Sequence, residues 1–189
     1  MTQGATTREV PDTAATPALS DRFKLVMAHY PAAVTVITTG RGNDRRGLTA
    51  TAVSSLSTEP ARLLVCVNRN ADAHDFFVRH GSFCVNLLDV TQVEVAKRFS
   101  AADGSRGAMR FARGEWEELA SGAPALADGL SSIDCRVFRM IEADTHTIIL
   151  GDVLDVRLRS DRLPLLYFKR EFCRLDLPAR PERTYAPGF

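Results

Sequence analysis

Residues 47–57 read Gly-Leu-Thr-Ala-Thr-Ala-Val-Ser-Ser-Leu-Ser, a run of small and hydroxylated side chains. A buried strand more often carries β-branched and large apolar residues. Small side chains let another group approach the backbone closely, and the hydroxyls offer it short polar contacts. The residues alone leave two interpretations open: a partly exposed barrel strand that packs against a helix, or a strand that lines a binding site.

The segments on either side of this run predict the strands that flank it. The β-branched residues 34–39 predict a strand, and residues 40–47 form a polar, glycine-bounded turn. Residues 48–57 then return as the hairpin partner of that strand. Pro60 ends the partner strand, and the continuous apolar run at residues 63–67 predicts a strand buried on both faces.

The rest of the chain shows no repeating β-α-β rhythm. Apolar periodicity and capping residues predict short helices at residues 20–30, with Ser20 as N-cap, 72–79 and 91–99. Strands are expected at residues 82–88, 133–141, 147–158, 165–168 and 172–175, with a loop at 101–114. This order favours a mainly β fold, a β-barrel with a few short inserted helices, over a doubly wound sheet. In strand 147–158, one face is expected to hold Ile148, Leu150, Leu154, Val156 and Leu158.

Length and charge limit the classes of function. The chain has 189 residues, which at roughly 150 residues per domain predicts one domain. Its 24 Lys and Arg against 23 Asp and Glu leave a net charge of +1, so neither nucleic acid nor an anionic membrane is indicated as a partner. The longest strictly apolar run, residues 63–67, is far shorter than the roughly 20 residues that span a bilayer.

The cysteines, histidines and termini give further expectations. The four cysteines form no C-x-x-C pair and the four histidines form no i,i+4 pair, so no metal site is expected. Residues 1–19 are rich in Thr, Ala and Pro and lack the apolar core of a secretory signal. This composition predicts a disordered tail on a reduced, cytoplasmic protein. The domain is then expected at residues 20–176, followed by an extended tail at 177–189.

Common catalytic motifs are missing. Gly40-Arg41-Gly42 with Gly47 has the wrong spacing for G-x-G-x-x-G and leads into a strand, so no helix N-terminus follows it for a pyrophosphate. The chain contains neither a Walker motif nor a G-x-S-x-G elbow. Hydrolase and metalloenzyme chemistry are therefore not favoured.

The run at residues 47–57, with Pro60 and the Leu-Leu-Val-Cys-Val-Asn-Arg of residues 63–69, closely resembles the flavin reductase family. The resemblance continues at residues 83–88, 96–99, 122–124, 144–153 and 164–168. Several motifs in the family's order make this a specific match, from Phe23 to Leu175.

The resemblance implies a Greek-key split β-barrel of the FMN-binding type, usually a homodimer with flavin near the interface. Family members are NAD(P)H-dependent flavin reductases of the EC 1.5.1 type, which transfer hydride from NADH, and sometimes NADPH, to FMN or FAD. They supply reduced flavin to the monooxygenase of a two-component system. FMN and FAD both stay open for this chain, as do tightly bound and diffusing flavin.

The same resemblance implies where the flavin lies. The small-residue strand would run along the isoalloxazine, where backbone groups stabilise the charge that develops on the ring. Ser54 and Ser55 would face the ribityl-phosphate end. The turn Asn68-Arg69-Asn70 would bind the phosphate through a guanidinium and amides. The strand residues implied in the cofactor site are Thr49, Ala50, Thr51, Ala52 and Val53.

Further residues are implied around the ring. His146, within Asp-Thr-His-Thr at residues 144–147, resembles the family histidine beside the nicotinamide and the flavin, and is the candidate catalytic residue. Tyr167 resembles a flavin-side residue. Asn86 and Phe99 either contact flavin or satisfy a backbone group and fill the core. Trp116 is expected to be structural.

The chain departs from the family after the phosphate turn. Ala71 and Ala73 stand where Ser or Thr is common, so two hydroxyls expected at the phosphate are missing. Arg69, Asn70 and the start of the next helix would compensate through cationic and N–H groups.

Two other functions stay open on the same barrel. A non-catalytic carrier or sensor would bind flavin without NADH turnover, and a flavin oxidase would keep its flavin and oxidise its own small substrate. The leading hypothesis is an NAD(P)H:flavin oxidoreductase. Its chemistry needs nicotinamide and flavin held about 3–3.5 Å apart and no paired acid and base, which agrees with the motifs found.

Overall fold

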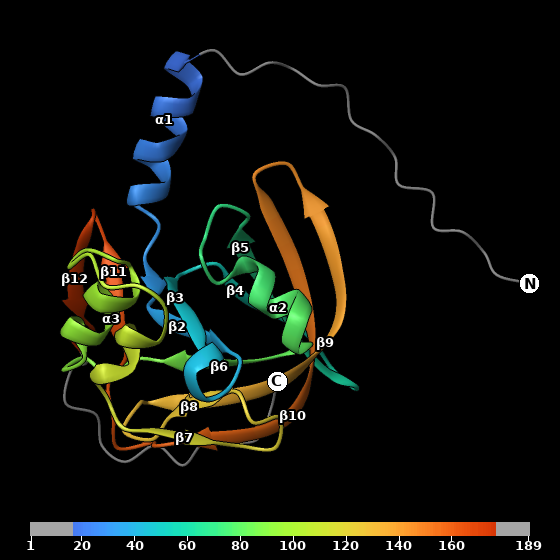
Figure 1. Cartoon of the computed structure of the whole chain (residues 1–189). Helices are drawn as coiled ribbons and strands as arrows, with labels where there is room; N and C mark the ends of the chain where they lie inside the picture. The colour runs from blue at the N-terminus through green and yellow to red at the C-terminus, as the bar shows by residue number, and fades with distance from the viewer. Residues whose placement is uncertain (1–16, 177–189) are drawn as a thin grey trace, which may run out of the picture.

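The computed structural model describes residues 17–176, in which strands predominate (Figure 1). The helices are α1 (Pro17–Ala28), α2 (His74–His80) and α3 (Val93–Phe99), with 3₁₀ turns η1 (Gly42–Asp44) and η2 (Gly107–Ala112). The strands are β1 (Ala32–Ala33), β2 (Thr35–Thr39), β3 (Arg46–Ala50), β4 (Val53–Thr58), β5 (Ala61–Asn68), β6 (Ser82–Leu87), β7 (Trp116–Glu118), β8 (Pro124–Leu126), β9 (Ser131–Ala143), β10 (His146–Leu158), β11 (Leu165–Phe168) and β12 (Glu171–Arg174). The main sheet has the order β3-β2-β6-β9-β10-β5-β4, beside smaller sheets β1-β11-β12 and β7-β8.

The main sheet curls because its two edges are joined by a very short connection. Only Thr51 and Ala52 lie between β3 and β4, which form opposite edges of the sheet. A connection of this length spans at most about 11 Å, so the two edges come together at this point. β3 pairs with β2 and β4 pairs with β5, so the seam between β3 and β4 stays open. The mainly β, split-barrel fold is confirmed.

The single strand expected at residues 48–57 is wrong. The chain changes its hydrogen-bond partner after Ala50, from β2 on one side of the seam to β5 on the other. The hairpin between β2 and β3 is nevertheless present, with Ile37 opposite Leu48. The seam therefore divides the expected strand into two.

Two apolar clusters fill the space around the sheet. In the first, Phe77 of α2 packs on Phe83 of β6 with ring centroids 6.1 Å apart. In the second, the rings of Phe99, Phe111 and Trp116 have centroids 4.9–5.3 Å apart. Trp116 is therefore structural, as expected. Alternate residues of the strands complete the first cluster: Ile37, Leu63, Val65, Val67 and Ile149.

Burial along the strands corrects two expectations. β5 alternates, so Leu64 and Cys66 are only half-buried and the strand is not buried on both faces. In β10 the buried positions are Thr147, Ile149 and Gly151. The face expected to carry the apolar residues is half-buried at Ile148 and Leu150 and exposed at Leu154, Val156 and Leu158.

The loop expected at residues 101–114 also contains structure. Within it, η2 directs Phe111 into the second apolar cluster. The predicted strands at residues 82–88, 133–141 and 165–168 are confirmed as β6, β9 and β11. Helix α2 ends at Gly81, whose φ is +62°.

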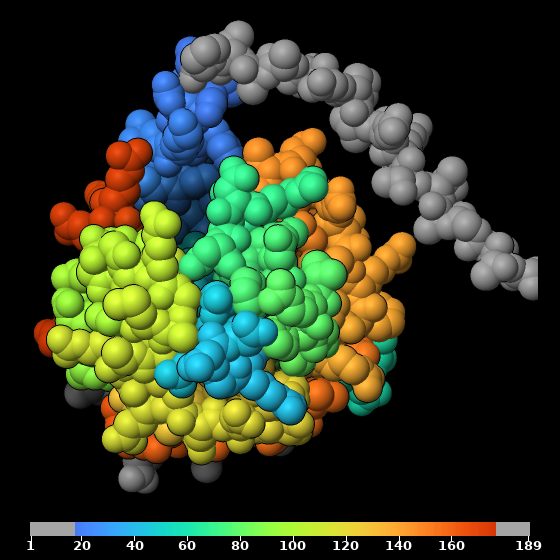
Figure 2. All heavy atoms as spheres, in the orientation of Figure 1, coloured from blue at the N-terminus to red at the C-terminus, as the bar shows by residue number. Residues whose placement is uncertain are grey.

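α1 begins at Pro17, so residues 17–19, expected in the tail, are helical. Its apolar stripe is exposed, with Phe23 at 62% and Val26 at 65%. Figure 2 shows the helix standing out from the body of the molecule. The N–H of Lys169 in the β11–β12 turn donates to the Ala28 carbonyl at 2.6 Å and ties the end of the helix to that turn.

Residues 1–16 and the tail expected at 177–189 lie outside the described residues. Within residues 17–176, no helix is both long enough and apolar enough to cross a membrane.

Candidate functional site

An open cleft of about 500 Å³ lies where the seam of the sheet meets α3 and the β11–β12 hairpin. This volume is typical of small-molecule sites, which measure about 300–1,000 Å³. One wall is the segment from Leu48 to Ala52, which ends β3 and crosses the seam. The other elements contribute Asn68, Lys97, Ser100, His146, Tyr167 and Arg170.

Local hydrogen bonds fix the small-residue wall. The Thr49 hydroxyl donates to the Ala96 carbonyl of α3 at 2.7 Å. The Ala52 carbonyl accepts the Cys66 N–H of β5 at 3.0 Å, which ties the crossing segment to the far edge of the seam. β3 is an edge strand, so half of its backbone groups point away from β2. The wall therefore combines small side chains with backbone groups that a bound molecule can reach.

A second hollow of about 620 Å³ opens from the cleft. Leu48, Thr49 and Ser100 line both spaces, so the two hollows are neighbours. The remainder of the second hollow combines small and apolar residues with the polar side chains of Asn70, Asp72, Arg106 and Arg110. The combined site thus has a small-residue end at the seam and a basic end beside η2.

The two arginines of the basic end have different surroundings. Arg110 is buried, donates to the Gly47 carbonyl at 2.7 Å and pairs with Asp72 at 3.1 Å. Arg106 is exposed, and no acidic group within residues 17–176 forms an ion pair with it. Arg110 therefore supports the wall, and Arg106 is the cation that an anionic ligand can reach.

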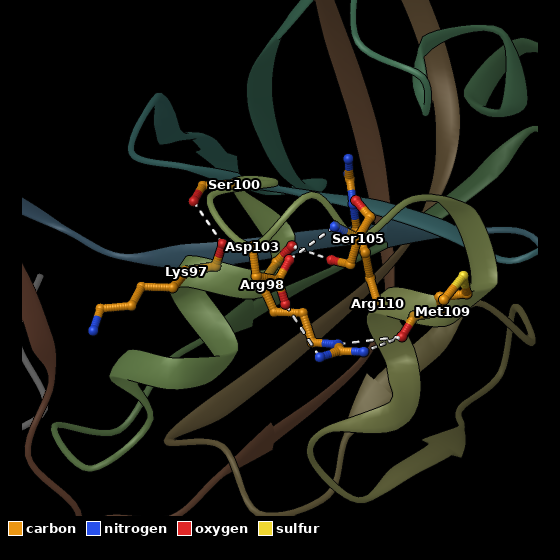
Figure 3. A network of polar contacts seen from close by, with 7 residues as sticks. All are labelled: Lys97, Arg98, Ser100, Asp103, Ser105, Met109 and Arg110. Atoms are coloured by element: carbon orange, nitrogen blue, oxygen red, sulfur yellow. Dashed lines mark hydrogen bonds and ion pairs between the residues drawn. The ribbon is translucent and has the colours of Figure 1, made fainter.

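The loop at the basic end is held by the network drawn in Figure 3. Arg98 of α3 donates to the Met109 carbonyl at 2.9 and 3.2 Å and to Asp103 at 3.2 Å. Asp103 accepts the Ser105 N–H at 2.9 Å, and Arg110 donates to the Ser105 carbonyl at 3.2 Å. Hydrogen bonds from Ser105, together with the charge of Arg98, hold the pKa of the Asp103 carboxyl below its usual range. The network stays charged at neutral pH and keeps the loop folded.

His146 enters the cleft from the start of β10. It lies opposite Asn68 of β5 in the sheet register. Its Nδ1 lies 2.9 Å from the Thr145 hydroxyl, a contact that orients the ring. Tyr167 lines the same cleft from β11, with its ring centroid 5.3 Å from that of Phe172. An imidazole, a phenol and an amide therefore share the space beside the small-residue wall.

Most of the residues implied by the resemblance lie around this site. The cleft lining includes Thr49, Ala50, Thr51, Ala52, Asn68, His146 and Tyr167. The second hollow adds Asn70 and Phe99, although Phe99 is mainly a core residue at 1% exposure.

Three strand residues lie elsewhere. Val53 lines a different hollow, together with Thr35 and Ile133. Ser54 and Ser55 are exposed on β4, beyond the crossing, and line neither the cleft nor the basic hollow. They were expected at the ribityl-phosphate end, and a role for them there stays a prediction.

Arg69 and Asn86 have contacts within the chain that lie outside the two hollows. The Arg69 guanidinium lies 3.4 Å from Glu142, at the end of β9, and is absent from both linings. Asn86 is fully buried: its amide donates to the Val36 carbonyl at 3.1 Å, and its oxygen accepts the Leu126 N–H at 2.7 Å. Since its polar groups are used internally, Asn86 satisfies the backbone and does not contact the cleft.

The departures at Ala71 and Ala73 have a structural consequence. Ala71 lines the basic hollow, whereas Ala73 is buried at the N-cap of α2 and makes no side-chain capping bond. A hydroxyl at position 71 would therefore face the hollow, and a hydroxyl at position 73 would stand at the N-cap of α2. In this chain Arg106 lines the same hollow.

Several residues that line the two hollows were not among the residues expected at the site from the sequence. Arg106 and Arg110 lie in the segment expected to be a loop, and Arg170 lies in the β11–β12 turn. Lys97 and Ser100 come from α3 and its end. The available signal was the Arg- and Gly-rich composition of residues 101–114, because a glycine-rich basic segment is suited to phosphate.

The described residues of the site form no metal-binding cluster. Within residues 17–176, no cluster of three His, Cys, Asp or Glu side chains is placed to hold a metal ion. The arrangement can instead position a flat ligand against the wall while Arg106 binds an anionic tail. The fold and the site together define a split-barrel protein with an open small-molecule cleft at the seam of its sheet.

Comparison with known proteins identifies the family. Residues 27–176 match the family described as flavin reductase like domain, and the chain belongs to it. It is 36% identical over 173 residues to the FMN reductase (NADH) RutF of Pseudomonas syringae pv. syringae, covering 88% of this chain and 96% of the relative. It is 37% identical to the 4-hydroxyphenylacetate 3-monooxygenase reductase component of Pseudomonas aeruginosa, covering 84% and 93%.

A solved structure supports the same fold. The NADH:FAD oxidoreductase SgcE6 of Streptomyces globisporus C-1027, in complex with NAD and FAD fragments, is 28% identical to this chain with a TM-score of 0.78. The match covers 89% of this chain and all of that one.

Proposed function

We propose that this protein is an NAD(P)H:flavin oxidoreductase that transfers hydride from NADH, or NADPH, to FMN or FAD and supplies reduced flavin to a partner monooxygenase. The observation that carries the proposal is the site formed by the two neighbouring hollows. It joins His146 and the small-residue wall to the basic hollow, in a chain of the flavin reductase family. This activity is of the EC 1.5.1 type.

The residues of the site have separate tasks in this reaction. The wall from Thr49 to Ala52 would bind the face and polar edge of the flavin ring, where fixed backbone dipoles stabilise developing charge without reorganisation. Arg106 and Asn70 would bind the phosphate end. His146 would orient the nicotinamide over the ring. When bound, the flavin supplies the hydride-accepting chemistry, and the chain supplies position and electrostatics.

The relatives support a partner oxygenase. One is named as the reductase component of 4-hydroxyphenylacetate 3-monooxygenase and another as an FMN reductase that uses NADH. We therefore assign the chain to the small component of a two-component system, with NADH as the donor. FMN is the expected flavin, and the similarity to an NADH:FAD oxidoreductase supports FAD as an alternative.

We also propose a homodimer in a reducing, cytoplasmic setting. The exposed apolar stripe of α1 supports the dimer, since a helix of about 12 residues is marginal in water without packing. The free cysteines at positions 66, 84, 135 and 173 support the reducing setting.

The test is steady-state oxidation of NADH by the purified chain with FMN, FAD or riboflavin added in turn. Flavin-dependent NADH oxidation is expected, together with faster reduction of the phosphorylated flavins than of riboflavin. Flavin binding without NADH turnover would favour a carrier or sensor. Flavin that stays bound through purification, and is reduced by a small substrate in place of NADH, would favour an oxidase.

A further inference from the structure

A strained two-residue turn presents an arginine to the cleft. Phe168 pairs with Glu171 in the β11–β12 hairpin, so Lys169 and Arg170 form the whole turn. Their φ values are +51° and +66°, in the left-handed region. Tight hairpin turns of this kind favour Asn-Gly because glycine adopts such angles without steric cost. Two long basic residues occupy these positions here, and backbone strain of this kind clusters at functional sites.

Arg170 occupies a junction between two hollows. It lines the cleft that contains His146, and it also lines an adjoining hollow that extends toward α1. Thr51, Ala52 and Tyr167 are the other residues common to both linings. Arg170 therefore lies at the end of the cleft where the chain crosses the seam, whereas the basic hollow opens beside Leu48 and Thr49.

The other cations of these two linings are already paired. Lys97 lies 2.9 Å from Glu94, and Lys24 lies 3.3 Å from Asp21. Arg170 is exposed, and no ion pair to it forms within residues 17–176. Its planar guanidinium is well suited to bidentate contact with a phosphate. Of the cations in the two linings, Arg170 is thus the one available to an anion.

We propose that Arg170 binds the diphosphate of NAD(P)H and thereby sets the KM for the nicotinamide dinucleotide. This inference rests on the proposed function. The flavin phosphate is assigned to the basic hollow, beside Arg106, so the dinucleotide is the remaining anionic ligand of the reaction. With its nicotinamide near His146, its diphosphate reaches the end of the cleft that Arg170 borders. The diphosphate is common to NADH and NADPH, so both donors depend on this residue.

The test compares Arg170→Gly with the wild type, because glycine removes the cation and the backbone strain together. The KM for NADH is expected to rise about tenfold with little change in kcat, which corresponds to about 1.4 kcal/mol for one charged hydrogen bond. The rise for NADPH should be similar. Arg170→Lys should recover part of the loss because it retains the charge. The affinity for ADP-ribose, measured by calorimetry, should fall by the same factor, whereas the Kd for FMN should not change.

Two controls distinguish the effect of the Arg170 charge from the effect of backbone strain in the turn. Lys169→Gly relieves the neighbouring strained residue and leaves Arg170 in place, so it should raise the Tm or leave it unchanged without altering the KM for NADH. The neutral donor 1-benzyl-1,4-dihydronicotinamide carries no phosphate, so Arg170→Gly should reduce flavin with it as fast as the wild type does.

Several results would overturn the inference while leaving the proposed function intact. These are an unchanged KM for NADH in Arg170→Gly, an equal loss with the neutral donor, a loss confined to NADPH, or a weaker affinity for FMN. A wild type that oxidises neither NADH nor the neutral donor with any flavin would instead overturn the proposed function.

Discussion

At the start of β10, His146 combines exposure to the cleft with a fixed ring orientation. The Thr145 hydroxyl lies 2.9 Å from its Nδ1, and Asn68 is its partner across the sheet. A ring held in this way has its Nε2 free to meet a ligand that enters the cleft. No acidic partner within residues 17–176 forms an ion pair with it, so the ring is available to position a ligand.

His146→Ala should therefore impair the use of NADH and spare the binding of flavin. The kcat/KM for NADH is expected to fall roughly three- to tenfold, since one positioning hydrogen bond is worth about 0.5–1.5 kcal/mol. The measurement is steady-state NADH oxidation at saturating flavin, paired with a flavin titration. A loss near 100-fold would indicate that the ring aligns the hydride donor, because a displacement of about 1 Å can cost that much. Normal kinetics would show that His146 is only an exposed residue of the hairpin.

Thr51 is the residue at which the seam and the cleft meet, and it tests the position of the flavin ring. Thr51→Arg should weaken flavin binding by more than about tenfold, or 1.4 kcal/mol, because its long side chain fills space beside the small-residue wall. The protein should still fold, since Thr51 is exposed. Thr58→Arg is the matched control at the exposed end of β4 and should bind FMN normally. Flavin fluorescence titration measures both, and equal affinities would show that the ring lies elsewhere.

Single residues explain why the site could be predicted only in part. His146, Tyr167 and the small-residue wall lie in motifs specific to the family, and the structure brings them into one cleft. The pattern could not place Asn86 and Arg69, since a polar residue in a strand and a cation in a turn are each compatible with a ligand or with an internal partner. The carbonyl of Val36 and the carboxylate of Glu142 are those internal partners. Both come from segments distant in sequence, so no local pattern indicates them.

At the scale of elements, the pattern predicted strands well and their pairing less well. The β-branched run of β2 and the long segments rich in apolar residues at β9 and β10 indicate strands, whichever strands they pair with. The division between β3 and β4 has no such signal, because small and hydroxylated residues continue without interruption through Thr51 and Ala52. The division arises because the sheet curls and the two halves of the run form hydrogen bonds with different strands, β3 with β2 and β4 with β5.

Three strands of the main sheet are joined by one carboxylate. Asp152 of β10 accepts the Arg62 Nε of β5 at 2.7 Å and lies 3.3 Å from Arg136 of β9. The register places both arginines directly opposite Asp152. The hydrogen bond from Arg62, with the help of Arg136, holds the pKa of this carboxyl below its usual 3.8.

A lowered pKa means that Asp152 stabilises the folded state only while it is ionised. This stabilisation is complete above the unfolded pKa of about 3.9 and is lost as the pH falls through the lower pKa of the folded state. Asp152→Asn should therefore be less stable than the wild type at neutral pH, and the difference should shrink as the medium is acidified below about pH 4. Urea unfolding at a series of pH values measures it.

Asp155→Asn provides the matched control on the same strand. Asp155 is exposed and accepts only the N–H of its neighbour Val156, at 2.8 Å, among the hydrogen bonds within residues 17–176. Its stability difference from the wild type should be small and should not depend on pH in this way. A pH-independent loss in Asp152→Asn would show that the side chain contributes by packing and not by charge.

For the whole molecule, the seam has two consequences. It leaves the cleft open at the edge of the sheet, and it places the β11–β12 turn close to the end of α1, where the Lys169 N–H bonds Ala28. α1 therefore projects beside the entrance to the ligand site while its own apolar stripe remains uncovered (Figure 2). The hollow shared by Met27, Tyr30, Thr51 and Arg170 joins the helix to the cleft.

This exposed stripe predicts that two copies of the chain associate through α1. Burial of a side chain such as Val26, now 65% exposed, contributes about 1.5–3 kcal/mol. Light scattering should give twice the 20.7 kDa mass of one chain at micromolar concentration. Val26→Asp should shift the mass toward that of one chain, because a carboxylate would have to be buried without a partner. Val78→Asp, at an equally exposed apolar position on α2, should leave the mass unchanged. A wild type of 20.7 kDa would contradict association through α1.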